Sequence, residues 1–199
     1  MRRSLIAVFA TLVFGVSSAP ADSCKFPDDM KTTPQNLNFS DAPVGTAPKD
    51  WLLGPEWFMP PHAPVYSAVS VPTEQCHGNQ QCATVYSLRA DPSVTLSFLY
   101  QDLDVTPYRG QILTYRAFVR VDPALKSVAR LLVRLHRKDC STTFRDDMGN
   151  HPIVSGEWAA YEIHAPIAMD AYHVEFGVQL IGEGAAWIDQ SSMEFAGLR

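Results

Sequence analysis

Beyond its first residues the chain has no long apolar run, and it has none of the short motifs that mark common active sites. It contains no Gly-x-Ser-x-Gly turn and no His-Glu-x-x-His pair, and its six histidines are spread along the sequence without metal-ligand spacing. The neighbouring Asp146 and Asp147 would point to opposite faces of an extended strand, whereas glycosidase carboxylates face each other across a cleft. We therefore expect a non-catalytic protein; a catalytic site assembled from distant loops is the alternative.

The one apolar stretch, residues 5–16, follows a basic start and is succeeded by small residues up to Ala21. This pattern is typical of a secretory signal peptide, and the stretch is shorter than the roughly 20 residues of a membrane span. We expect residues 1–21 to be the signal peptide, and the mature chain to be secreted or periplasmic without a membrane span. Lipid attachment at Cys24 is the alternative, but the charged Asp22 fits such a site poorly.

Positive charge is scarce, since 16 lysines and arginines stand against 21 acids and give a net charge of −5. Removal of residues 1–21 takes away two arginines and no acid, which leaves 14 basic and 21 acidic residues and a net charge of −7. This balance argues against nucleic acid and anionic lipid as partners, because both require clustered positive charge.

Residues 22–35 are polar and aperiodic and are expected to form an N-terminal tail. Residues 36–199 are long enough for one domain with its own core.

Only four cysteines are present, at positions 24, 76, 82 and 140. An even number in an exported chain indicates two disulfides. Cys76 and Cys82 enclose a short segment whose glycine and asparagine suit a tight turn, which leaves Cys24 to pair with Cys140. Metal binding by these thiols is the alternative, but no Cys-x-x-Cys pair occurs.

Long helices are absent from the pattern as well, since 15 prolines are spread along the chain and no segment keeps a 3.6-residue apolar period. Apolar and polar residues instead alternate strictly in four segments, which predicts strands with one buried and one wetted face. These segments are 94–100, 113–121, 129–136 and 172–180. In segment 94–100 the even positions are expected to be buried. The Gly-Glu-Gly sequence at 182–184 is predicted to be a hairpin connection. The fold class is therefore all-β, a two-sheet antiparallel β-sandwich.

Several short motifs follow one another along residues 36–196. They are Asn-Leu-Asn-Phe-Ser-Asp at 36–41, Cys-His-Gly-Asn-Gln-Gln-Cys at 76–82, Pro-Tyr-Arg-Gly-Gln at 107–111, Asp-Asp-Met-Gly-Asn-His-Pro-Ile at 146–153 and Gly-Glu-Gly-Ala-Ala-Trp-Ile-Asp at 182–189. In this order the chain resembles bacterial galactose-binding-like jelly-roll domains, β-sandwiches related to carbohydrate-binding modules, in their standalone form. The resemblance implies an exported, non-catalytic binding module that recognises carbohydrate. Because fold does not fix function, an envelope protein-interaction module remains the alternative, followed by a small hydrolase.

Two departures from that family concern a structural calcium, which related sandwiches often hold between acids near the first and last strands. Ser40 stands where the family commonly has Glu, and Gln190 stands where a second Asp is common. Asp41 and Asp189 remain as candidate calcium ligands, although calcium prefers six to eight oxygens. No other cofactor is expected.

The polar faces of the predicted strands supply most of the candidate ligand-binding residues, because Arg, His and Gln offer hydrogen bonds to sugar hydroxyls. They are Arg116, Arg120, Arg134, His136 and Gln179, with Arg130, His173 and Glu175 expected on the same polar faces. Trp57 and Phe58 form an aromatic loop that could stack on sugars, and Asp147 lies in a polar loop that could join such a site. A solvated sheet face, and loops that only cover the end of the sandwich, are the alternatives.

Overall fold

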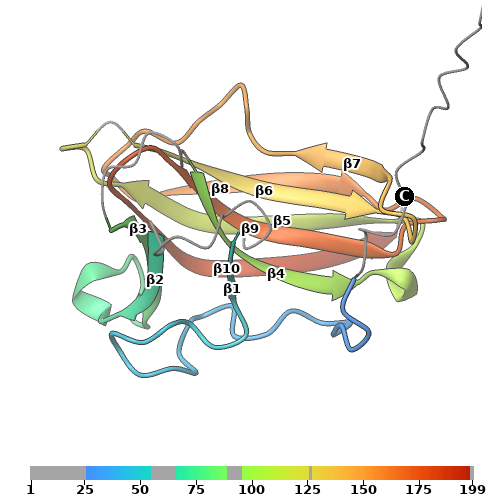
Figure 1. The fold of residues 1–199 in the computed structure, drawn as a ribbon, viewed down its shortest axis with the longest axis horizontal. Helices are drawn as coiled ribbons and strands as arrows, with labels where there is room; N and C mark the ends of the chain where they lie inside the picture. Colours follow the sequence, from blue (N-terminus) through green and yellow to red (C-terminus); the bar gives the residue numbers. More distant parts are fainter. Residues whose placement is uncertain (1–25, 55–65, 89–95, 126, 198–199) are drawn as a thin grey trace, which may run out of the picture.

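The computed structural model of the chain describes residues 26–54, 66–88, 96–125 and 127–197 (Figure 1). These residues form ten strands and two short 3-10 helices, η2 (Thr73–Gln75) and η3 (Thr106–Tyr108). The strands are β1 (Leu52–Gly54), β2 (Tyr66–Val71), β3 (Cys82–Ser87), β4 (Leu96–Asp104), β5 (Gln111–Val121), β6 (Val128–His136), β7 (Thr142–Asp146), β8 (Ala159–Pro166), β9 (His173–Ile181) and β10 (Ala185–Gly197). Within this part of the chain, no helix is long and apolar enough to span a membrane.

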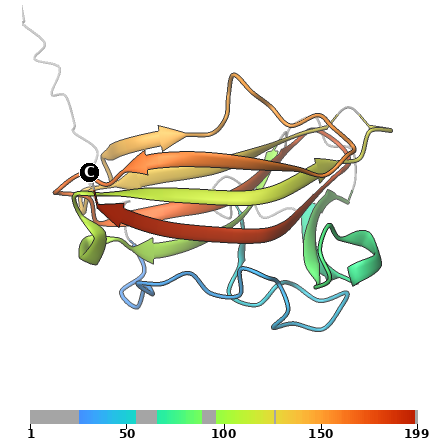
Figure 2. The same ribbon diagram turned by 180° about the vertical axis from the view of Figure 1, so that it is seen from behind.

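The strands are arranged in two five-stranded sheets. Sheet A has the order β1-β4-β9-β6-β7 and sheet B has the order β2-β3-β10-β5-β8. All neighbouring strands are antiparallel. Figures 1 and 2 show the two sheets stacked as layers with their long strands running the length of the molecule. The predicted all-β, two-sheet antiparallel sandwich is confirmed.

The core lies between the sheets and is built from alternate residues of the long strands. Leu131 and Val133 of β6 and Val174 and Phe176 of β9 meet Tyr115 of β5 there, and each is fully buried. Burying an apolar side chain of this size contributes about 1.5–3 kcal/mol relative to leaving it in water. Because the side chains of a strand alternate between its faces, the intervening residues of β6 and β9 point away from the core.

The prediction for β4 was wrong about which face is buried. The even positions were expected inside, but the core contains Leu99 and Leu103, whereas Phe98 is not part of it. Ser97, expected on the wetted face, is 2% exposed and donates to the Gly54 carbonyl. The physical reason is that β4 carries large apolar residues on both faces, so its alternation does not reveal which face meets the core.

The Gly-Glu-Gly sequence at 182–184 does not close a hairpin. It links β9 in sheet A to β10 in sheet B, so the chain crosses from one layer to the other here. Gly182 and Gly184 have φ angles of +88° and +127°, which only glycine adopts easily. The turn residues were recognised correctly, but they do not determine which partners the flanking strands take. Strand β9 pairs instead with β4 and β6.

The chain before β1 runs along one long side of the sandwich, beside β4 (Figures 1 and 2). Lys31 forms a parallel bridge with Leu103, and the Asp104 N–H donates to the Lys31 carbonyl at 2.9 Å. Gln101 accepts from the Gln35 N–H with its side-chain oxygen at 3.0 Å. The described part of the predicted tail, 26–35, is therefore attached to sheet A by backbone and side-chain hydrogen bonds.

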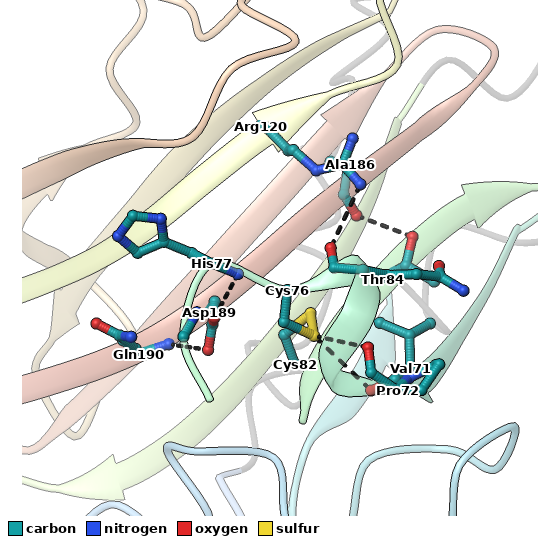
Figure 3. The surroundings of a disulfide bond; sticks show 12 residues. Val71, Pro72, Cys76, His77, Cys82, Thr84, Arg120, Ala186, Asp189 and Gln190 are labelled. Atoms are coloured by element: carbon teal, nitrogen blue, oxygen red, sulfur yellow. Dashed lines mark hydrogen bonds between the residues drawn. A yellow bond between two sulfur atoms is a disulfide. The ribbon is translucent and has the colours of Figure 1, made fainter. Parts of the chain in front are cut away.

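The Cys76–Cys82 disulfide predicted from the sequence is present, with its Cα atoms 5.6 Å apart (Figure 3). It closes the loop that leads into β3. None of the described cysteines is free. The proposed partner of Cys140, Cys24, lies outside the described residues, as does the predicted signal peptide, so both stay predictions.

Candidate ligand-binding face

The outward side chains of three adjacent strands of sheet A lie in rows across the sheet. We call this surface the outer face of sheet A. Strand register places β4, β9 and β6 residues opposite one another, in that order. The rows are Phe98–Gln179–Arg130, Tyr100–Gly177–Leu132, Asp102–Glu175–Arg134 and Asp104–His173–His136. Two arginines, a glutamine and a glutamate are thus brought from sequence positions up to 49 residues apart to one surface.

Arg134 lies in the middle of this face. Its Nη1 is 3.6 Å from Oε2 of Glu175 on the neighbouring strand. Its guanidinium also lies over the ring of Phe98, 5.1 Å from the ring centroid, which is within cation–π range. Burial lowers the pKa of Arg134, while the charge of Glu175 acts in the opposite direction. A guanidinium held by an acid on one side and a ring on the other is fixed in orientation.

A second acid–arginine pair lies at the edge of the face. Arg145 of β7 is opposite Arg134 in the register, and its Nη2 donates to Oδ2 of Asp147 at 2.6 Å. Burial alone would raise the pKa of Asp147, but the hydrogen bond from Arg145 and the charges of Arg145, Arg130 and Arg134 lower it overall. Asp147 is therefore a carboxylate that balances part of the charge of three arginines.

Glu175 is the acid at the centre of the face. Its side chain is 27% exposed. Burial raises its pKa, but the nearby His136, His173 and Arg134 outweigh burial, so the pKa is lowered. At neutral pH Glu175 is therefore an ionised acceptor between Arg134 and two histidines.

Five polar atoms of this face have no hydrogen-bond partner among the described residues: Nε of Arg130, Nε of Arg134, Oε1 of Gln179, Nε2 of His136 and Nδ1 of His173. Gln179 is only 5% exposed and lies between Arg130 and Phe98 in the register. Buried polar groups in folded proteins are nearly always hydrogen-bonded, to protein or to water. Unpartnered donors and acceptors on one face therefore indicate a place where a ligand or ordered water completes the hydrogen bonding.

Gly177 keeps the centre of the face free of side chain on β9. A Cβ at this position would lie 2.0 Å from the carbonyl oxygen of Leu99 and 2.8 Å from the Cα of Tyr100. The close approach of β9 and β4 therefore requires glycine at this position, and Gly177 is buried between Tyr100 and Leu132 in the register.

The structure brings together only part of the residues predicted to bind ligand. Arg134, His136 and Gln179 share the outer face of sheet A, and Asp147 contacts its edge through Arg145. Trp57 and Phe58 lie outside the described residues. The sequence reasoning missed Arg145, because β7 has only five residues and shows no clear alternation, and Phe98, because it was assigned to the core.

Arg116 and Arg120 are on β5 and therefore belong to the opposite side of the sandwich. Arg120 lies between two indole rings, 4.0 Å from the Trp187 centroid and 5.3 Å from that of Trp158. Its Nη2 donates to the Gln75 carbonyl at 3.4 Å. Arg120 is thus engaged in holding β5 and β10 to Trp158 and η2, whereas Arg116, the other arginine of the predicted pair, is exposed.

Asp41 and Asp189, the candidate calcium ligands, have different surroundings. Asp189 is 1% exposed, and its Oδ2 accepts from the His77 N–H at 2.9 Å (Figure 3). The same oxygen accepts from the Gly78 N–H at 2.8 Å. Its Oδ1 accepts from the Gln190 N–H at 2.6 Å. Asp41 is exposed. The calcium site stays a prediction, and the geometry shows that Asp189 anchors the disulfide loop to β10.

Neither a scan against protein-family models nor a search of curated proteins gave a match. Solved structures do match. The CBM22-1 xylan-binding domain of Paenibacillus barcinonensis Xyn10C is 9% identical, covers 82% of this chain and 94% of its own, and has a TM-score of 0.55. The C-terminal family 22 carbohydrate-binding module of Clostridium thermocellum Xyn10B is 10% identical, covering 75% and 87%, with a TM-score of 0.53.

A third match is the enzymatically active domain of bacteriophage CBA120 tailspike protein 4, at 10% identity and a TM-score of 0.57. It covers 82% of this chain but 21% of that one, so this chain matches one module of a larger protein. At such identities the likeness concerns the fold alone. The chain has the β-sandwich fold of carbohydrate-binding modules.

Proposed function

We propose that this protein is an exported, non-catalytic module that binds carbohydrate with the outer face of sheet A. The observation that carries the proposal is the group of unpartnered polar atoms on Arg130, Arg134 and Gln179, on the same face as the ionised Glu175. The carbohydrate-binding-module fold supports it. Export is supported by the N-terminal sequence pattern and by the Cys76–Cys82 disulfide, since disulfides persist in oxidising compartments.

The chemistry of this face suits a sugar. Sugar hydroxyls both donate and accept, so they can use the guanidinium N–H groups of Arg130 and Arg134 together with the oxygens of Gln179 and Glu175. Hydrogen bonds to charged groups contribute roughly 1.5–3 kcal/mol each when they are well formed. Tyr100, which is half-buried, lies in the register between the rows of these groups and adds an aromatic residue to the face.

Sheet B is the weaker candidate, although two of the predicted arginines lie there. Arg120 is already held between two indole rings and hydrogen-bonded to a carbonyl. Using it for a ligand would first require breaking these contacts. The two faces can therefore be told apart by substitution, because each has its own arginine at an outward position.

The test is a glycan array followed by titration calorimetry on the oxidised protein, with Arg134→Ala and Arg116→Ala as matched variants on opposite faces. We expect Arg134→Ala to weaken binding by about 10- to 100-fold, the loss of one or two charge-assisted hydrogen bonds, and Arg116→Ala to change it by less than about twofold. Urea unfolding of both variants checks that they remain folded.

A binding loss in Arg116→Ala but not in Arg134→Ala would move the site to sheet B and contradict the proposed face. A blank array with well-folded protein would contradict carbohydrate binding. In that case recovery of one stoichiometric partner from envelope extract would favour the alternative, a protein-interaction module that uses the same surface.

A further inference from the structure

The row of the outer face that contains His136 and His173 has a chemistry different from that of the arginine rows. One ring nitrogen of His136, one of His173 and one carboxylate oxygen of Glu175 all lie within 4.8 Å of one another. His173 is 2% exposed, and the side chains of His136 and Glu175 are 16% and 27% exposed. The two histidines are direct neighbours in the register of β6 and β9, so backbone pairing holds them together.

The hydrogen bonds of His136 determine which of its nitrogens is available. Its Nδ1 lies 3.3 Å from the carbonyl oxygen of Cys140, and a carbonyl only accepts, so Nδ1 carries the proton. In the neutral ring Nε2 then has a lone pair. Nε2 is buried without a hydrogen-bond partner among the described residues and lies 3.9 Å from Oε2 of Glu175.

His173 is oriented in the same way by a carboxylate. Its Nε2 lies 3.0 Å from Oδ1 of Asp102 on β4, so Nε2 donates and Nδ1 has the lone pair in the neutral ring. This Nδ1 is also buried without a partner among the described residues. The ring of Phe26 covers the histidine, with centroids 4.3 Å apart. A buried imidazole held by a carboxylate, with its second nitrogen unused, is the usual arrangement of a metal-ligating histidine.

We propose that His136, His173 and Glu175 bind a divalent transition-metal ion, of which zinc suits the donor set best. Two imidazoles and one carboxylate are common zinc ligands, with a fourth position left for water or a ligand oxygen. Bonds of about 2.0–2.1 Å place neighbouring ligand atoms about 3.3 Å apart in a tetrahedral site, so small side-chain rotations are required here. The ion would satisfy both orphaned ring nitrogens.

The charged groups around this site are Asp102, Asp104, Arg134 and Glu175 on β4, β6 and β9. Three of the four are acids, which favours a cation. Arg134 is the competitor, because it lies 3.6 Å from the same Glu175 oxygen that is nearest to His136. The proposal does not depend on carbohydrate binding, and zinc is added to the protein alone.

The experiment is calorimetric titration of zinc into tag-free, fully oxidised protein at pH 7.5, with cobalt(II) absorption as a second readout of coordination geometry. We expect one ion per chain, the intense visible absorption of four-coordinate cobalt, and a Kd raised at least 30-fold by His136→Gln. The matched control is His164→Gln. His164 also contacts an acid, with Nε2 2.7 Å from Glu162, but it is exposed and on the opposite sheet.

His173→Gln is the second variant, and urea unfolding decides whether it is folded before its zinc affinity is compared. Because His136 is nearer the surface, His136→Gln tests the site even if the His173 variant does not fold. The proposal is overturned if no zinc binds up to 1 mM, or if wild type and His136→Gln bind zinc with equal affinity. His136 and Glu175 would then be a pair without a metal ion. Loss of binding in His164→Gln would also overturn it.

Discussion

Asp189 offers a sharp test of the structure, because its carboxylate accepts three backbone N–H groups inside the protein. Oδ2 accepts from His77 and Gly78, and Oδ1 accepts from Gln190. Asp189→Asn replaces one oxygen by an NH2 group and keeps the shape. In either orientation the NH2 faces at least one backbone N–H, so the best case loses one charge-assisted bond and leaves one buried donor unpaired.

The expected cost follows from these two losses. A charge-assisted hydrogen bond contributes about 1.5–3 kcal/mol, and a buried unpaired donor costs about 1–3 kcal/mol, with some overlap between the two. We expect Asp189→Asn to lower the free energy of unfolding by about 2–4 kcal/mol. For a domain of this size the unfolding midpoint should fall by roughly 4–16 °C.

The assay is urea and thermal unfolding of oxidised protein, followed by intrinsic fluorescence. Asp41→Asn is the matched control, because Asp41 is exposed and should change stability by no more than about 0.5 kcal/mol. If Asp189→Asn is as stable as Asp41→Asn, the account of the loop anchor is wrong. The same unfolding experiment is repeated with EDTA. We expect EDTA to leave the unfolding midpoint of the wild type unchanged, since backbone N–H groups already occupy the Asp189 carboxylate. If EDTA instead lowers the wild-type midpoint but not that of either variant, the protein has a calcium site.

Two further predictions concern the outer face of sheet A. Gly177→Ala should lower the free energy of unfolding in urea by more than about 3 kcal/mol, or prevent folding, because its Cβ would lie 2.0 Å from the Leu99 carbonyl oxygen. The control Gly197→Ala should be near neutral, because nothing lies within 4 Å of a Cβ there. Equal stability of the two variants would contradict the close approach of β9 and β4. The folded-state pKa of Glu175 is lowered, so its contribution to stability is present above the ordinary value of about 4.5 and is lost as the pH falls through the folded value. Glu175→Gln should therefore be less stable than wild type at pH 7, and the difference should narrow as unfolding is measured from pH 6 down to pH 3; a constant difference would refute this reading.

The sequence predicted the fold class because alternation along β5, β6 and β9 is strong enough to show which residues are buried. It failed on β4, where Phe98 and Leu99 are neighbours and both are large. Alternation shows only that a residue points outward, and a β-sandwich has two outer faces, one on each sheet. It does not show to which of the two a residue belongs. Arg116 and Arg134 were therefore grouped together, although they belong to opposite faces.

The candidate site could be predicted only in part, because it is made by register between distant segments. Glu175 lies beside Arg134 and Asp102 only because β9 pairs with both β6 and β4. No residue pattern near Gly182 indicates that β9 and β10 belong to different sheets. His173 was expected to be exposed, yet Asp102 and Phe26 cover it, and neither contact is visible from the local sequence.

The alternation along β6 and β9 has a consequence for how such a surface can evolve. Leu131 and Val133 stabilise the sandwich from one side of a strand, while Arg130 and Arg134 face outward from the same strand. Exchanging the outward set would change recognition with little effect on the core, because the two sets lie on opposite faces of the strand. Gly177 is the exception, since strand spacing fixes it. Any specificity that arises on this face must therefore be built around a position in its middle that cannot carry a side chain.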